Sequence, residues 1–154
     1  DQDGDYDILY SNGDAFDYIP PRPRPWHGVQ WLENEGGLNF TFHRITDFAG
    51  AFSARPLDVD RDGDLDIFVV SAFNRWEDPE AQSFIWLENN GRMRFRRHDI
   101  ASSPTHILVL DTGDFDADGD VDMVTGGMHT YPPNDRMARI MLWENEYATR
   151  GGGR

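Results

Sequence analysis

The sequence of 154 residues lacks several residue types and patterns, and each absence excludes a class of protein. It has no cysteine, so neither a disulfide framework nor a thiolate metal site is available. No apolar run approaches the ~20 residues that a membrane-spanning helix needs. Nucleophile-elbow, glycine-rich phosphate-loop and H-E-x-x-H motifs are also missing, so no catalytic constellation is visible and we expect a non-enzymatic protein.

Lysine is absent as well, and all 14 basic residues are arginines. Because 28 residues are acidic, the formal net charge is −14. Such an excess of negative charge repels the phosphates of nucleic acid. We therefore expect the acidic residues to attract cations, and we expect no nucleic-acid partner.

The most regular acidic stretch covers residues 58–66, with the sequence DVDRDGDLD, and a β-prone run follows it at 67–70. It reads D-x-D-x-D-G-x-x-D. Carboxylates at positions 1, 3, 5 and 9 can converge on one hard cation, and the glycine at position 6 permits a sharp positive-φ turn. The pattern recurs at 114–122, and a shortened copy without its first aspartate opens the chain at 1–7. Together the three loops hold 14 of the 28 acidic residues.

Calcium is the cation that suits these loops best, because it takes six to eight oxygen ligands in a flexible geometry. With one bidentate carboxylate and water, each complete loop reaches that number. The expected ligands of the first complete loop are the side chains of Asp58, Asp60, Asp62 and Asp66 and the carbonyl of Asp64. Those of the second are the side chains of Asp114, Asp116, Asp118 and Asp122 and the carbonyl of Asp120. The shortened copy offers Asp1, Asp3, Asp7 and the carbonyl of Asp5.

Other metals and other calcium loops fit less well. Magnesium requires a tighter octahedral geometry, and soft metals prefer nitrogen or sulfur ligands. An EF-hand needs a glutamate at position 12, where this sequence has Val69 or Thr125 within an expected strand.

The loops belong to an internal repeat, which three markers define in one register. From Asp3 to Asp62 is 59 residues, and from Asp62 to Asp118 is 56 residues. The second marker is W-L-E-N at 31–34 and 86–89, with the permuted form L-W-E-N at 142–145. The third is F-x-x-H-x-I at 40–45 and 95–100. A fixed period of this length is typical of a repeat architecture.

Each repeat contains short β-prone segments separated by Asn- and Gly-rich turns, and helical periodicity is missing. Strands are expected before the loops at 51–57 and 106–113, and after them at 6–11, 65–72 and 121–126. Third strands are expected at 29–33, 83–88 and 140–144, and fourth strands at 38–45 and 93–100. Four antiparallel strands per repeat make an all-β fold of β-propeller blades.

About two and a half blades are present. Residues 1–48 form a blade without its first strand, 49–104 a complete blade, 105–147 a blade without its last strand, and 148–154 a flexible tail. A closed ring needs at least four blades. We therefore expect the chain to be a fragment of a larger protein, whose further blades or a second copy would cover the open edges.

The acidic loop, the strand after it and the W-L-E-N-x-G hairpin resemble FG-GAP/VCBS repeats, the calcium-loop blades of integrin-α-type propellers. The resemblance covers residues 1 to about 147. It implies that each complete loop joins the first and second strands of its blade and holds calcium in a structural role. The shortened loop departs from the family pattern at its first position.

The long connections between second and third strands are the place where we expect ligand binding, because loops on a rigid scaffold commonly carry it. They contain aromatic residues flanked by arginine, which suit sugar stacking or a protein contact. The candidate residues are Trp26, His27, Arg75, Trp76, His129, Tyr131 and Arg136.

Three functions remain open at this point. The first is an adhesion or ligand-binding module for a glycan or a protein, secreted to the cell surface, the periplasm or the extracellular space, where calcium is abundant. The second is part of a polysaccharide-active, lyase-like enzyme built on a calcium-containing propeller. The third is a spacer without a ligand.

Overall fold

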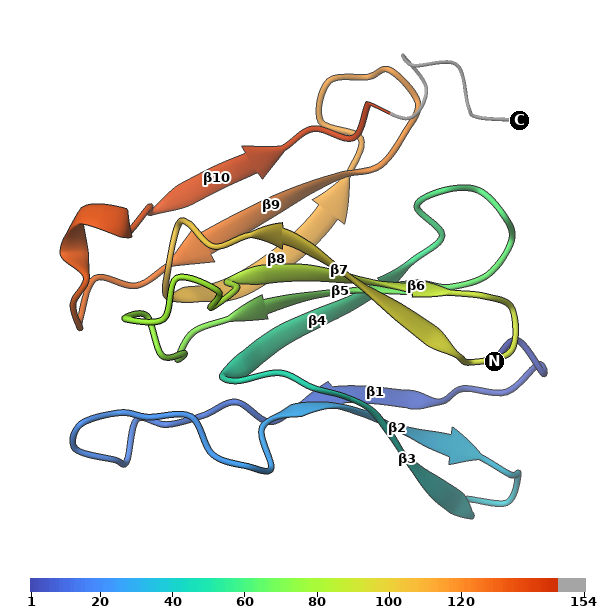
Figure 1. Ribbon diagram of the computed structural model, residues 1–154. Coiled ribbons are helices and arrows are strands. Elements are labelled where there is room, and N and C mark those ends of the chain that lie inside the picture. Colours follow the sequence, from blue (N-terminus) through green and yellow to red (C-terminus); the bar gives the residue numbers. More distant parts are fainter. Residues whose placement is uncertain (147–154) are drawn as a thin grey trace.

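The computed structural model describes residues 1–146, and these residues form three antiparallel sheets (Figure 1). The first sheet has the order β1-β2-β3, the second β4-β5-β6-β7 and the third β10-β9-β8. The fold is therefore all-β, as the sequence predicts, and it is an incomplete propeller because the sheets do not close a ring. The tail expected at 148–154 and the last residue of the unit 105–147 lie outside the described residues.

The strands agree with the sequence-based expectation to within about two residues at each end. Those of the first sheet are β1 (Ile8–Ser11), β2 (Gly28–Asn34) and β3 (Phe40–Asp47). Those of the second are β4 (Ala51–Leu57), β5 (Asp66–Ser71), β6 (Phe84–Asn89) and β7 (Phe95–Ala101). Those of the third are β8 (Ile107–Gly113), β9 (Asp122–Gly127) and β10 (Ile140–Trp143).

Helical structure within residues 1–146 is confined to one 3-10 turn, η1 (Asn134–Arg136), which the sequence analysis did not predict. It follows two prolines, which cannot donate to a strand ladder and so interrupt the chain before β10. In the part of the chain that the structure describes, no helix has the length and apolar character needed to span a bilayer.

Two hydrophobic clusters hold the three sheets together, and β5 contributes to both. Ile67 and Val69 pack with Val29 of the first sheet, whereas Phe68 and Val70 pack with residues of the third sheet. Successive side chains of a strand point to opposite faces. The continuous apolar run of β5 is therefore explained by burial on both sides, and each such side chain contributes about 1.5–3 kcal/mol.

The strands place two kinds of connection at opposite ends of the molecule (Figure 1). The acidic loops 1–7, 58–66 and 114–122 lie at the end drawn on the right. The β1–β2, β5–β6 and β9–β10 connections, together with η1, lie at the end drawn on the left. Any metal site in the loops is therefore separated from any ligand site in the long connections by the length of the strands.

Candidate metal centres

The structure brings three carboxylates together in each complete acidic loop. In the first loop, one oxygen each of Asp58, Asp60 and Asp62 lies within 4.8 Å of the others. The corresponding group in the second loop is Asp114, Asp116 and Asp122. Both groups are drawn from the ligands predicted for the respective loop, and each could hold a metal ion.

Backbone N–H groups of the first loop orient its carboxylates. Asp58 accepts a hydrogen bond from the N–H of Gly63 at 3.2 Å, and Asp62 accepts one from Asp64 at 2.9 Å. Gly63 has φ +97°, and a Cβ built on it would meet no atom within 4 Å. Glycine is therefore favoured at position 6 because of its positive φ, since a Cβ would meet no neighbouring atom there.

The second loop repeats this arrangement. Asp114 accepts hydrogen bonds from the N–H groups of Ala117 at 2.7 Å and Gly119 at 3.2 Å. Asp118 accepts one from the N–H of Asp120 at 3.0 Å. Gly119 has φ +92°, close to the value of its counterpart in the first loop. The two loops thus share the bonds from the N–H groups at positions 6 and 7 to the aspartates at positions 1 and 5.

The last aspartate of the first complete loop is buried, and its two oxygens differ in their hydrogen bonding. Asp66 is fully buried, and its Oδ1 accepts the N–H of Asn89 at 2.8 Å. Its Oδ2 and the buried Oδ1 of Asp58 have no hydrogen bond of normal geometry. Burial raises the pKa of Asp66 to about 6, against smaller opposing effects of Asn89, the Trp86 indole and Val59. In the second complete loop, the equivalent Oδ2 of Asp122 accepts the N–H of Phe115 at 2.9 Å.

One asparagine per repeat holds the last aspartate of each loop, and the sequence analysis missed this role. Its backbone N–H donates to the aspartate, and its Nδ2 donates to the carbonyl one residue before that aspartate. The first bond measures 2.9, 2.8 and 2.8 Å for Asn34–Asp7, Asn89–Asp66 and Asn145–Asp122. The second measures 3.2, 3.2 and 3.4 Å to the carbonyls of Tyr6, Leu65 and Val121. The constant spacing of 23 residues in the second and third repeats was the available signal.

Substitution of Asn89 tests the contribution of these asparagine hydrogen bonds to stability. In Asn89→Ala the carbonyl of Leu65 and the N–H of Gly91 each lose a side-chain partner. Because these groups are partly buried, we expect the free energy of unfolding to fall by about 1–2 kcal/mol. Urea unfolding followed by tryptophan fluorescence measures it. Asn90→Ala is the matched control, since Asn90 is exposed on the same hairpin and only its backbone N–H is bonded; equal losses in both variants would contradict this contribution.

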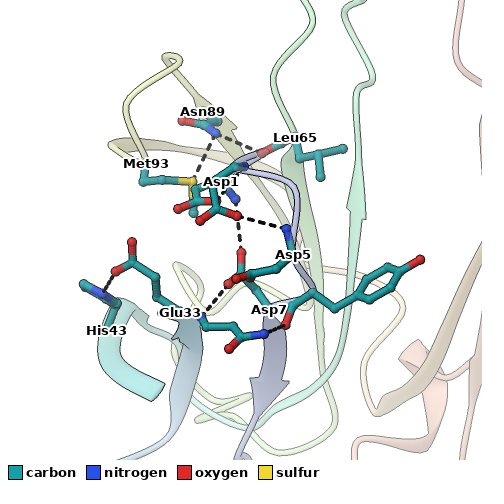
Figure 2. A network of polar contacts seen from close by, with 11 residues as sticks. Asp1, Asp5, Asp7, Glu33, His43, Leu65, Asn89 and Met93 are labelled. Carbon is teal, nitrogen blue, oxygen red and sulfur yellow. Dashed lines mark hydrogen bonds and ion pairs between the residues drawn. The ribbon is translucent and has the colours of Figure 1, made fainter. Parts of the chain in front are cut away.

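The shortened loop at the chain start keeps the internal bonding of the complete loops (Figure 2). The N–H of Asp3 donates to Asp1 at 3.1 Å, and the N–H of Asp5 donates to Asp3 at 3.2 Å. Among residues 1–146, the two groups of three converging carboxylates lie in the complete loops and not here.

The tryptophan of W-L-E-N packs in the same way in the first two repeats and differently in the third. Trp31 stacks on His43 with ring centroids 4.7 Å apart, and His43 is bonded to Glu33 at 2.6 Å (Figure 2). Trp86, His98 and Glu88 form the same arrangement, with distances of 4.5 and 2.6 Å. The permuted third repeat instead places Trp143 against Phe84 and bonds its indole N–H to Thr125. The recurring histidines are thus engaged within their own sheets.

A cleft of about 720 Å³ lies at the opposite end, where the three long connections meet. Its walls come from residues 20–23 of the β1–β2 connection, 73–77 of the β5–β6 connection and 131–133 of the β9–β10 connection, together with His106. Clefts of this size suit small molecules or short polymer segments. The three long connections therefore share one cleft.

The seven candidate ligand residues are distributed unevenly around this cleft. Arg75, Trp76 and Tyr131 line it, whereas Trp26, His27, His129 and Arg136 are not among its lining residues. His27 and Trp76 are buried, and their burial argues against contact with a ligand at the surface. The Nδ1 of His27 accepts the N–H of Gly50 at 3.2 Å, and Arg136 donates to the carbonyl of Trp76 at 2.7 Å. These contacts explain His27 and Arg136 as residues that hold the connections in place.

His106 lines the cleft although it was not among the candidates. Burial first, and then the positive charge of Arg136 and the neighbouring His129, lowers the pKa of His106 to about 4. Its Nδ1 lies 2.9 Å from the hydroxyl of Thr105. The ring is therefore neutral at pH 7 and belongs to the packed floor of the cleft.

Stacked antiparallel sheets, each built around a strand that starts at an acidic loop, define a repeat protein of the β-propeller class. Residues 1–69 and 58–125 match the FG-GAP-like repeat, and the chain belongs to this family. No curated protein matches the sequence.

Proposed function

We propose that the chain is a calcium-binding module of a β-propeller that works outside the cell in adhesion or ligand binding, with calcium in a structural role. The observation that carries the proposal is the pair of converging carboxylate groups, together with the buried, unbonded Oδ2 of Asp66. An acidic loop alone would be a solvated turn. The burial of Asp66, whose Oδ2 lacks a hydrogen bond of normal geometry, adds to this support.

The donor set supports calcium over other ions. The candidate ligands are carboxylates and a backbone carbonyl, which suit hard cations, and the loops offer enough of them for six or more bonds. In the first loop, Asp58, Asp60, Asp62 and Asp66 would hold the ion with the carbonyl of Asp64. Because the protein supplies most of the bonds, little room remains for a substrate. Calcium would thus fix the connection between β4 and β5, and in the third sheet that between β8 and β9.

The ligand-binding part of the proposal concerns the cleft at the other end. Arg75 and Tyr131 are exposed or partly exposed on its walls, beside the prolines at 20–23 and 132–133. Aromatic and proline rings offer flat apolar surfaces to a sugar or a peptide, and an arginine adds hydrogen-bond donors. A glycan or protein ligand is therefore proposed for this cleft, and the calcium loops would stiffen the sheets that carry it.

Calcium titration by isothermal calorimetry tests the proposal. We expect saturable binding at two sites in the wild-type chain, and at one fewer in Asp116→Asn. Glu80→Gln removes the same charge from an exposed residue in the β5–β6 connection and should leave the binding unchanged. Absence of a calcium-binding heat, or equal weakening by both substitutions, would overturn the metal sites.

The enzyme alternative keeps some support because His106, Arg75 and Glu77 line the same cleft. A screen against acidic polysaccharides separates the two functions. Saturable binding without turnover supports the binding module that we propose. Release of unsaturated sugar products would instead show a lyase, and Arg75→Ala would then abolish it.

A further inference from the structure

Position 4 of each acidic loop has an unusual backbone conformation. Gln2, Arg61 and Ala117 have φ of 68°, 61° and 66°, the left-handed region that residues with a side chain rarely adopt. Strain of this kind persists only where the surroundings fix it. Its recurrence in all three loops shows that it belongs to the loop and not to one sequence. The side chain at position 4 is therefore held in the same direction in each repeat.

That side chain bonds to the next acidic loop along the chain. The Nε2 of Gln2 donates to the carbonyl of Gly63 at 2.7 Å. The guanidinium group of Arg61 donates to the carbonyl of Gly119. Both contacts run from position 4 of one loop to the glycine at position 6 of the following loop. The same contact made by two different side chains indicates a feature of the repeat.

The accepting carbonyl belongs to a peptide group that also holds a candidate metal ligand. The carbonyl of Gly119 and the N–H of Asp120 form one peptide, and this N–H donates to Asp118 at 3.0 Å. In the preceding loop, the peptide between Gly63 and Asp64 likewise donates to the carboxylate at position 5 at 2.9 Å. A hydrogen bond to the carbonyl of a peptide polarises it and strengthens its N–H as a donor. The contact from the neighbouring loop therefore acts on the position-5 carboxylate through a single peptide.

Arg61 contacts the second complete loop through the carbonyl of Gly119. The N–H of Gly119 is also bonded, since it donates to Asp114 at 3.2 Å. Arg61 thus contacts the turn between two candidate ligands of the second complete loop.

We propose that the two complete calcium loops are coupled through Arg61, so that calcium bound at 58–66 strengthens calcium binding at 114–122. This inference rests on the proposed calcium sites. An ion bound by Asp60 and Asp62 encloses Arg61 between two ligands and holds its strained backbone in place. The guanidinium then stays on the Gly119 carbonyl, and Asp118 is kept in position before its own ion arrives. Gln2 makes the corresponding contact with the first complete loop.

Calcium titrations of the whole chain, followed by ¹H–¹⁵N correlation spectra, test the coupling. The amide signals of Gly63 and Gly119 report the first and second complete loops separately. In Arg61→Ala we expect the affinity at 114–122 to fall about five-fold, at the lower end of the usual range for coupled sites. Asp60→Asn with Asp62→Asn, which removes the first site, should lower it by the same factor. The combination of all three substitutions should lower it no further than either change alone.

The effect of losing the Arg61 charge can be distinguished from the effect of losing its hydrogen bond, because the two change calcium affinity in opposite directions. Loss of a positive charge beside the loop would by itself strengthen calcium binding, so weaker binding in Arg61→Ala reports the lost contact. Arg94→Ala removes an equal charge from the exposed β6–β7 hairpin and should change neither site. Because Arg61 is exposed, its substitution leaves the hydrophobic clusters intact.

The outcomes distinguish this inference from the proposed function. If both glycine signals titrate with calcium and the affinity at 114–122 is the same in all variants, the sites are independent and the coupling is wrong. If neither signal responds in the wild-type chain, the calcium proposal itself fails and the coupling fails with it. Additive losses in the combined variant would also overturn the coupling.

Discussion

Removal of calcium with excess chelator is expected to lower the melting temperature by roughly 10–20 °C. A ligand that binds only the folded state at 100 times its dissociation constant adds about 2.7 kcal/mol per site, so two sites add roughly 5 kcal/mol. For a chain of this size, each kcal/mol shifts the melting temperature by about 2–4 °C. Without the ion, the carboxylates that converge in each loop repel one another. Differential scanning calorimetry with and without chelator measures the shift.

Two controls make this result specific. Calcium added back in excess should restore the original melting temperature, whereas magnesium at the same concentration should not. A chain with one disabled loop, Asp116→Asn with Asp118→Asn, should show about half of the shift. A melting curve that does not change in chelator would refute the structural role of calcium.

Substitution of Gly50 by alanine is expected to destabilise the fold strongly. Gly50 has φ +66°, and a Cβ built on it would lie 1.9 Å from the carbonyl oxygen of Phe73. Its own carbonyl accepts the N–H of Ala72 at 3.0 Å, so the turn cannot move away without losing a bond between connections. Backbone strain and overpacking together should cost about 4 kcal/mol or more. Urea unfolding in saturating calcium measures the loss.

Gly36→Ala is the matched control for this substitution. Gly36 also has a positive φ, +84°, but a Cβ built on it would meet nothing within 4 Å. Only the backbone strain of about 1–2 kcal/mol should therefore remain. If the two variants unfold at the same urea concentration, the close approach of Gly50 to the β5–β6 connection does not limit the stability of the fold.

The strands were predictable because local sequence signals in each repeat mark where its strands begin and end. The glycine at position 6, the β-branched run after Asp66 and the Asn-Gly hairpin mark the beginning and end of β5 and β6 by local chemistry. These signals act over a few residues, and the repeat presents them several times. The carboxylates that converge in each complete loop were also visible, since the spacing of Asp58, Asp60 and Asp62 lies within one turn of chain.

The features that could not be predicted depend on how one sheet packs against the next. Nothing in the local sequence around His27 indicates that Gly50 will donate to its ring, and this contact explains its burial. The bonds from Gln2 and Arg61 to the following loop span 61 and 58 residues, so a single repeat does not reveal them. The η1 turn was missed for a different reason, since a three-residue element has no periodicity.

The exchange of one residue pair in the third repeat changes what its tryptophan contacts. Where the second repeat has Trp86-Leu87, the third has Leu142-Trp143, and alternation along the strand turns the indole to the opposite face. There Trp143 packs against Phe84 of the neighbouring sheet. A copy of the second repeat inserted in its place would leave this face of Phe84 without its indole. The second and third repeats are therefore not interchangeable at this contact between neighbouring sheets.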